Sequence, residues 1–268
     1  MTTARLLPFL FALLVAAPAA ASTSCPQFFP GSQVPALLNP KLAQRGTLLC
    51  NDAYASFASG VTHGALWSAE HPTRASLQAA HEMPREGEFH PDDRLPVADQ
   101  AQLQDYRRSG YDRGHMTPSG DMPDEAAQQQ SFSLANMVPQ TPDLNRGVWS
   151  RIETAVRRLA ERRGELFVVT GAAFVGSNIA SIGPDGVLVP SSTWKAIFDP
   201  VAGGTGVYVC SNTSAPHCAV VSVATLEREV GIDPFPALPA AIKVQAMALP
   251  EPGADRHHGR GKTDNAAE

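Results

Sequence analysis

The sequence predicts an α+β protein in which helices pack on a central, antiparallel-rich sheet. Three observations support this class: one long amphipathic helix, several apolar segments of strand length, and two such segments close enough to form a hairpin. The 268 residues include 23 prolines and 21 glycines, which implies many loops and argues against a helical bundle. With 43% hydrophobic and 18% charged residues, the composition is that of a globular protein. The formal net charge is −5, so an anionic substrate would need a local basic patch.

The N-terminus has the pattern of a cleaved targeting segment. Arg5 precedes an apolar stretch from Leu6 to Val15, and three alanines at 19–21 form a small-residue cleavage site. The apolar stretch is too short to span a bilayer comfortably, although a retained anchor is the alternative interpretation. We therefore expect residues 1–21 to be a signal peptide, the mature protein to be secreted or periplasmic, and no contact with a membrane.

Four cysteines follow this segment, and an even number behind a signal peptide favours disulfides. Three connectivities exist. The pairs Cys25–Cys50 and Cys210–Cys218 are preferred because each pair is close in sequence and a long cysteine-free stretch separates the two. Zinc binding is the weaker alternative, since no Cys-x-x-Cys spacing occurs.

The elements of the first half are short. Residues 22–52 are Pro-rich and are expected to form an N-terminal strap on the main domain, residues 53–249. Loose apolar alternation over 51–70 predicts two short strands, whereas 70–99 is polar, contains four prolines and is expected to be mostly loop. A short capped helix is predicted over 124–133.

The clearest helix covers about residues 147–163. Apolar residues recur there at helical spacing, and Gly164 is a natural stop. Strands are predicted at 165–170, 187–190 and 193–198, and a hairpin is predicted to join 207–210 to 218–223. The tail 250–268 is expected to be disordered. The polar face of this helix carries six arginines and two glutamates: Arg146, Arg151, Arg157, Arg158, Arg162, Arg163, Glu153 and Glu161. This face is either an ordinary solvated surface or a row of arginines that binds successive phosphates.

Two motifs carry residue types suited to phosphodiester hydrolysis. The first motif is Asp112-Arg-Gly-His115, in which Arg113 can hold a phosphate oxygen and a neutral His115 can take a proton from water. Gly114 lets the backbone turn tightly. The same four residues also fit an ordinary surface turn. Asn145 precedes the predicted helix, and Glu153 follows eight residues later, about 2.2 turns, so both are expected near one face. Such oxygen ligands suit Mg²⁺, which keeps most of its waters.

Asp-Arg-Gly-His followed by Asn-x-Gly-x-Trp-x-x-x-Glu resembles the DNA/RNA non-specific endonucleases of the ββα-metal type, a family that includes endonuclease G and secreted bacterial sugar-non-specific nucleases. The resemblance spans roughly residues 53–229 and implies that 53–249 is an endonuclease domain with a ββα-metal finger. It also implies Mg²⁺-dependent hydrolysis of DNA and RNA with little sequence specificity, for which Mn²⁺ or another divalent ion can substitute.

The resemblance assigns a role to each motif residue. His115 matches the general base that activates the attacking water, and Arg113 matches the arginine beside the scissile phosphate. Asn145 matches the direct metal ligand. Glu153 matches a catalytic carboxylate that holds the metal through water. Asp112 is expected only to steady the turn.

Three further positions are expected to bind substrate. Asn136 matches an asparagine that supports the metal and histidine region, and Arg157 matches another phosphate-binding arginine. An upstream arginine is also expected, with Arg85 preferred and Arg74 the rival.

Other functions compete with this interpretation: a nucleic-acid-binding module with a dead site, a structural or adhesive domain, and a phosphodiesterase for another ester. A dead site is disfavoured because His115, Asn145 and Glu153 are all present. Plasmid cleavage with Mg²⁺ and then with EDTA would separate the remaining classes. The sequence leaves a homodimer and a protein inhibitor open.

Overall fold

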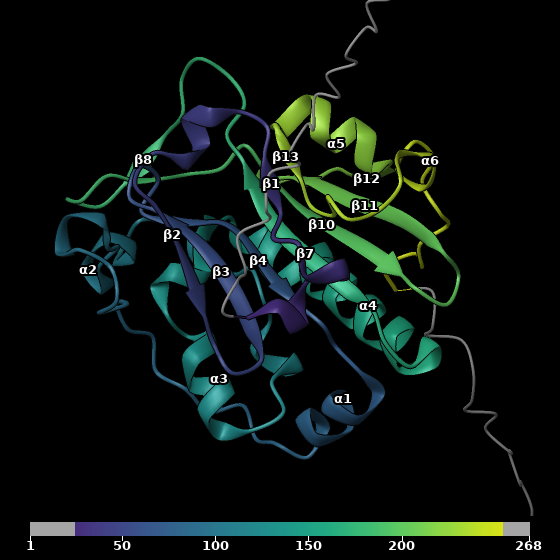
Figure 1. Ribbon diagram of the computed structural model, residues 1–268. Helices are drawn as coiled ribbons and strands as arrows, with labels where there is room; N and C mark the ends of the chain where they lie inside the picture. Colours follow the sequence, from purple (N-terminus) through teal and green to yellow (C-terminus); the bar gives the residue numbers. More distant parts are fainter. Residues whose placement is uncertain (1–24, 254–268) are drawn as a thin grey trace, which may run out of the picture.

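A seven-stranded antiparallel sheet forms the centre of the computed structural model, which describes residues 25–253 (Figure 1). The strand order is β12-β11-β10-β7-β4-β3-β2. The strands are β2 (Gly46–Cys50), β3 (Tyr54–Ser59), β4 (Gly64–Glu70), β7 (Phe167–Ala173), β10 (Ser192–Asp199), β11 (Gly204–Ser211) and β12 (Cys218–Val221). This sheet and its flanking helices confirm the predicted α+β class.

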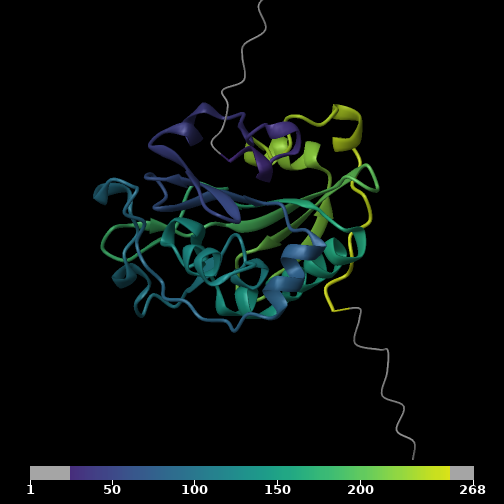
Figure 2. The same cartoon turned by 60° about the horizontal axis from the view of Figure 1, so that its bottom comes forward.

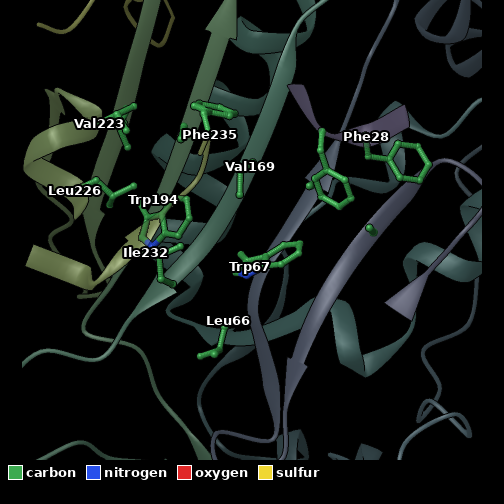
Figure 3. Packing of buried hydrophobic residues seen from close by; sticks show 14 of the residues in the cluster. Phe28, Leu66, Trp67, Val169, Trp194, Val223, Leu226, Ile232 and Phe235 are labelled. Atoms are coloured by element: carbon green, nitrogen blue, oxygen red, sulfur yellow. The ribbon is translucent and has the colours of Figure 1, made fainter. Parts of the chain in front are cut away.

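One face of the sheet packs on the segment that begins at Cys25 and on α5 (Val223–Val230). Trp67, Val169 and Trp194 project from β4, β7 and β10 into a buried cluster, where Leu226 of α5 meets them (Figure 3). The three sheet residues lie within 1% of full burial, so this cluster anchors the N-terminal segment and the C-terminal part of the domain to one surface.

The opposite face packs on α1 (Arg74–His81) and α4 (Ser150–Arg163), so helices cover both faces of the sheet (Figure 2). Val168 and Ile197 point to this face because side chains alternate along a strand. They meet the predicted apolar stripe of α4, including Ile152. The helix ends as predicted at Gly164, whose φ is +102°.

Shorter elements complete the fold. Three small antiparallel pairs are β1 (Ala36–Leu37) with β13 (Ile232–Asp233), β5 (Asp112–His115) with β6 (Met137–Gln140), and β8 (Ser181–Ile182) with β9 (Val187–Leu188). The other α-helices are α2 (Leu103–Tyr106), α3 (Glu125–Ser131) and α6 (Ala240–Lys243). A π-helical turn, Leu144–Trp149, runs directly into α4.

Two segments differ from the sequence prediction. Residues 74–81, expected as loop, form α1, because Thr73 caps the helix and exchanges hydrogen bonds with Ser76 in a capping box. Pro72 therefore precedes the helix and does not interrupt it. Within the expected strap, β2 is an edge strand of the main sheet and pairs with β3.

Both predicted disulfides are present: Cys25–Cys50 and Cys210–Cys218. Residues 1–24 and 254–268 are outside the described residues, so the signal peptide at 1–21 and most of the tail 250–268 stay predictions, as do the domain boundaries. Across residues 25–253, no helix combines the length and the apolar character needed to cross a membrane.

Candidate active site

A β-hairpin and a helix bring the two sequence motifs together. Strand β5 pairs with β6 so that His115 lies opposite Met137 and Gly114 opposite Val138. The chain then passes through the π-helical turn into α4. Gly147 inside that turn has non-helical angles (φ −98°, ψ −114°), so Asn145 and Glu153 do not share one regular helix as the spacing argument assumed. The turn, and not helical periodicity, brings them to one cavity.

This cavity has a volume of about 470 Å³ and contains most of the predicted site. Its lining residues are Arg85, Arg113, His115, Pro118, Ser119, Gly120, Asn145, Arg146, Ser150, Glu153, Thr154 and Arg157. Arg85 comes from the loop after α1, and the others come from the hairpin, the following turn and α4. One histidine, one asparagine, one glutamate and four arginines therefore line the same space.

His115 is 7% exposed, and its Nε2 has no hydrogen-bond partner among the described residues. Its ring lies edge-on to Phe132, with 5.0 Å between centroids, and 5.7 Å from Phe89. Burial, assisted by the charge of Arg85, lowers the pKa of His115 to about 3. The imidazole is therefore neutral near pH 7, and its Nε2 is a buried polar atom whose hydrogen-bonding capacity no described residue uses.

Asp112 orients the amide of Asn145. The Asn145 Nδ2 donates to Asp112 Oδ2 at 3.0 Å. The Arg146 guanidinium donates two hydrogen bonds to the same carboxylate, from Nε at 2.8 Å and from Nη2 at 2.6 Å. Although burial alone would raise it, hydrogen bonds from Arg146 and Asn145 lower the pKa of Asp112. Because the amide nitrogen is committed to a carboxylate, the Asn145 oxygen is the atom left for a cation. Asp112 does more than steady a turn.

Glu153 has no hydrogen bond or ion pair with any residue of the described chain. Burial raises the pKa of Glu153 to about 7, and the charge of Asp121 raises it further, whereas Lys195, Arg157 and Arg85 act in the opposite direction. A carboxylate without a partner and beside an amide oxygen is a donor set that fits a hard divalent cation. Within residues 25–253, no group of three His, Cys, Asp or Glu side chains could hold a metal ion.

The arginines of the cavity are held in different ways. Arg157 is largely buried and forms an ion pair with Asp121. The Arg113 guanidinium lies over the Phe89 ring, 4.3 Å from its centroid. Arg85 lines the cavity, whereas its rival Arg74 donates to the Glu161 carbonyl at the far end of α4.

The row of arginines on α4 is not one continuous track. Arg163 pairs with Asp199 at 2.8 Å and does not line the cavity, while Arg146 and Arg157 line it and are already paired with carboxylates. Helical periodicity identified the polar face but could not show the acidic partners, because these come from other segments.

Two expected roles need correction. Asn136 is fully buried and does not line the cavity: its Oδ1 accepts from Ser68 Oγ and Thr117 N, and its Nδ2 donates to the Thr117 and Ser131 carbonyls. With every amide position used, it supports the segment after His115 but does not contact substrate. Gly114 lies in a strand and not in a tight turn, and a Cβ there would lie 2.3 Å from Gln140 Oε1.

Sequence reasoning missed a buried charged group beneath the cavity. Lys195 of β10 is 1% exposed, and its Nζ donates to Thr170 Oγ1 at 2.5 Å and lies 5.7 Å from the Trp149 ring. Glu70 of β4 is 3% exposed, and burial, together with the charge of Asp121, raises its pKa well above the usual value. The available signal was a lysine inside an otherwise apolar strand segment.

Residues 35–241 match the family model described as DNA/RNA non-specific endonuclease, and the chain belongs to this family of divalent-metal-dependent nucleases. It is 35% identical over 192 residues to "Nuclease EXOG, mitochondrial" of Danio rerio, an alignment that covers 64% of this chain and 56% of that protein. It is 30% identical over 211 residues to "Endonuclease G, mitochondrial" of Homo sapiens, which covers 72% and 70% respectively. A solved structure of EndoG in complex with EndoGI aligns with a TM-score of 0.65 and 26% identity, over 69% of this chain and 84% of that one.

The chain thus spans little more than half the length of the zebrafish relative. These relatives contradict the prediction of a secreted or periplasmic protein, because they are named as mitochondrial nucleases, as is Nuclease 1 of Schizosaccharomyces pombe at 32% identity. The N-terminal pattern failed to discriminate because an arginine without acidic neighbours occurs in mitochondrial targeting segments as well as in secretory ones.

Proposed function

We propose that this chain is a Mg²⁺-dependent endonuclease that hydrolyses phosphodiester bonds of DNA and RNA, with His115 as general base. The observation that carries the proposal is the unpartnered Nε2 of a neutral, buried histidine in the same cavity as Asn145, Glu153 and four arginines. Family membership supports the same activity.

In this mechanism His115 Nε2 takes a proton from a water molecule, and the water oxygen attacks phosphorus in line with the leaving 3′ oxygen. The P–O3′ bond breaks, and the leaving oxygen acquires a proton from solvent. Arg113 and Arg85 bind non-bridging phosphate oxygens, and their charge stabilises the extra negative charge of the transition state. A base of low pKa remains unprotonated at neutral pH but accepts a proton less strongly than a free histidine.

The donor set fits Mg²⁺, which Asn145 Oδ1 would hold directly and Glu153 through water. When bound, the ion supplies Lewis-acid stabilisation of the phosphate and the leaving oxygen. Asp112 keeps the amide oxygen of Asn145 directed away from its own carboxylate. Mn²⁺ or another divalent ion with oxygen preference can substitute.

Low sequence specificity follows from the chemistry of the cavity. Arginines recognise phosphate oxygens, which are the same at every nucleotide and carry no base information. A water nucleophile does not require the 2′-hydroxyl, so both DNA and RNA are substrates in this proposal. A homodimer and a protein inhibitor of this chain stay predictions.

Cleavage of supercoiled plasmid and of a labelled RNA tests the proposal. We expect cleavage of both with Mg²⁺, none with EDTA, and a loss of about 10²- to 10⁴-fold in His115→Ala. His81→Ala is the matched control, because His81 is exposed and pairs with Glu161 outside the cavity. Binding of DNA without cleavage by the wild-type protein would instead indicate a binding module. Activity of His115→Ala close to wild type would remove His115 from the base role.

A further inference from the structure

A second basic cavity adjoins the candidate active site on the α2 side. It has a volume of about 500 Å³ and is lined by Leu103, Gln104, Tyr106, Arg107, Arg108 and Arg113. We call it the α2 groove. Arg113 lines both the α2 groove and the cavity that contains His115, so the two spaces meet at this side chain. A ligand bound at Arg113 can therefore extend into either.

The positive charge of the α2 groove is not neutralised by neighbouring protein groups. Arg107 and Arg108 are exposed, and neither side chain forms a hydrogen bond or an ion pair within residues 25–253. The nearest carboxylate in sequence, Asp105, is buried and turned inward: its oxygens accept from the backbone N–H groups of Gln102 and Asp185. No acidic side chain lines the groove.

One lining residue of the groove also carries a buried polar atom without a partner. Tyr106 is 5% exposed and lines the groove, and its phenol oxygen has no hydrogen-bond partner among the described residues. Burial raises the pKa of Tyr106, so the phenol keeps its proton and can donate a hydrogen bond. The guanidinium groups of Arg107 and Arg108, unpaired among the described residues, suit an anionic oxygen ligand.

The turn that carries the two arginines is fixed in place. Ser109 Oγ donates to the Tyr106 carbonyl and accepts from Tyr111 N, and Arg108 has a positive φ of 59°. Helix α2 also packs closely on the β8–β9 hairpin, where a Cβ at Gly183 would lie 2.2 Å from the Asp105 Cα (Figure 1). A fixed backbone lowers the entropic cost of ligand binding at this turn.

We propose that the α2 groove is a second phosphate subsite, in which Arg107 and Arg108 bind the sugar–phosphate backbone of the strand that flanks the scissile phosphate. The proposal rests on the nuclease function proposed above and extends it. Arg113 contacts the scissile phosphate, and the strand continues past it into the groove. The subsite contributes to affinity for long substrates and not to the chemical step, because neither arginine lines the cavity of His115.

Substrate length separates this role from catalysis. The test compares the wild type with Arg107→Gln, Arg108→Gln and the double variant on a 30-base-pair duplex and on bis(4-nitrophenyl) phosphate, which occupies only the scissile position. We expect a raised KM on the duplex with little change in kcat, and unchanged kinetics on the small ester. Arg228→Gln is the matched control, since Arg228 is an exposed arginine on α5 and is paired with Glu229.

Salt dependence gives a second readout that a merely structural role would not reproduce. Each lost duplex contact should lower the slope of log affinity against log salt by about 0.9, so the affinity ratio between 50 and 200 mM salt should fall about 3.5-fold per arginine. Arg107→Lys keeps the charge and should retain most of the wild-type slope. Binding is measured in the inactive His115→Ala background.

The outcomes are distinguishable. If the double variant has the wild-type KM and salt slope on the duplex while the wild type cleaves it, the subsite is refuted. If the variants change only inhibition by inorganic phosphate, the groove binds a free anion and the proposal is also refuted. Failure of the wild type to cleave any phosphodiester with Mg²⁺ would overturn the proposed function itself.

Discussion

Asp112→Ala tests whether the orientation of Asn145 controls metal affinity. The substitution removes the carboxylate that accepts from Asn145 Nδ2 at 3.0 Å and leaves the amide free to rotate. A hydrogen bond to a charged group contributes about 1.5–3 kcal/mol, and the Asp112 side chain is only 15% exposed, so solvent replaces it poorly. At about 1.4 kcal/mol per tenfold change, the Mg²⁺ concentration for half-maximal activity should rise by about 10- to 100-fold.

The contribution of the Arg146 ion pair must be separated from this effect. Arg146 is 71% exposed, so its ion pair with Asp112 is screened by solvent and contributes little. Arg146→Gln removes the ion pair but keeps the hydrogen bond between Asp112 and Asn145. We expect its Mg²⁺ requirement to change less than that of Asp112→Ala.

The assay is the initial rate of plasmid cleavage against Mg²⁺ concentration, together with calorimetric Mg²⁺ binding in the His115→Ala background. Thermal unfolding of each variant checks that the fold is intact. A folded Asp112→Ala variant with the wild-type Mg²⁺ dependence would refute the argument that Asp112 sets the position of the Asn145 oxygen. If Asp112→Ala and Arg146→Gln raise the Mg²⁺ requirement equally, the ion pair between Asp112 and Arg146, and not the hydrogen bond to Asn145, controls Mg²⁺ affinity.

Three other predictions concern pH, the carboxylate and the disulfide. Because burial and Arg85 lower the pKa of His115 to about 3, His115 stays deprotonated as pH falls from 7 towards 4. Glu153, whose pKa burial raises to about 7, would take up a proton in this range, so the profile is measured at saturating Mg²⁺, which favours the ionised carboxylate. Under that condition kcat/KM should show no loss at the usual histidine pKa near 6.5. Removing the positive charge in Arg85→Gln raises this pKa, so the acidic limb of the pH–rate profile should move towards neutral pH; an unmoved limb would contradict the electrostatic coupling. Glu153→Gln should reduce turnover and raise the Mg²⁺ requirement, as a metal titration of the cleavage rate would show, and wild-type behaviour would exclude Glu153 from the metal site. Replacing Cys25 and Cys50 by serine opens a loop with a sequence separation of 25 and should lower the free energy of unfolding by about 3 kcal/mol in urea denaturation.

The features that the sequence predicted well depend on local patterns. The apolar stripe of α4 recurs every three or four residues, and the hairpin of β11 and β12 is closed by cysteines eight residues apart. The sequence prediction lacks α1 because prolines flank this helix at 72 and 84 and suggest a loop, whereas the cap at Thr73 starts a helix. A proline just before an N-cap is compatible with a helix, so the residue context and not the count was the informative signal.

In the candidate site too, the residues in local motifs could be predicted from the sequence, whereas their partners from distant segments could not. His115, Asn145 and Glu153 belong to motifs and were recognised individually, and the structure brings them to one cavity. The partners that set their properties come from distant segments: Asp112 beside Asn145, Phe132 beside His115, and Lys195 beneath Glu153. No spacing rule connects residue 195 with residue 153, because their proximity depends on the packing of α4 on the sheet.

The packing also explains why the cavity can attract both a cation and an anion. Glu153 lines the cavity, and the charges of Lys195 and Arg157 lower its pKa, whereas the charge of Asp121 raises it. Arg113 lines both this cavity and the α2 groove, and we propose that it binds the phosphate. In the proposed function, Asn145 and Glu153 would hold a divalent cation that offsets the carboxylate charge, while the arginines would bind phosphate oxygens. The antiparallel sheet fixes the position of Lys195, because this residue of β10 lies opposite Tyr208 of β11 and Thr170 of β7. The charge of Lys195 therefore acts on Glu153 although Lys195 does not line the cavity.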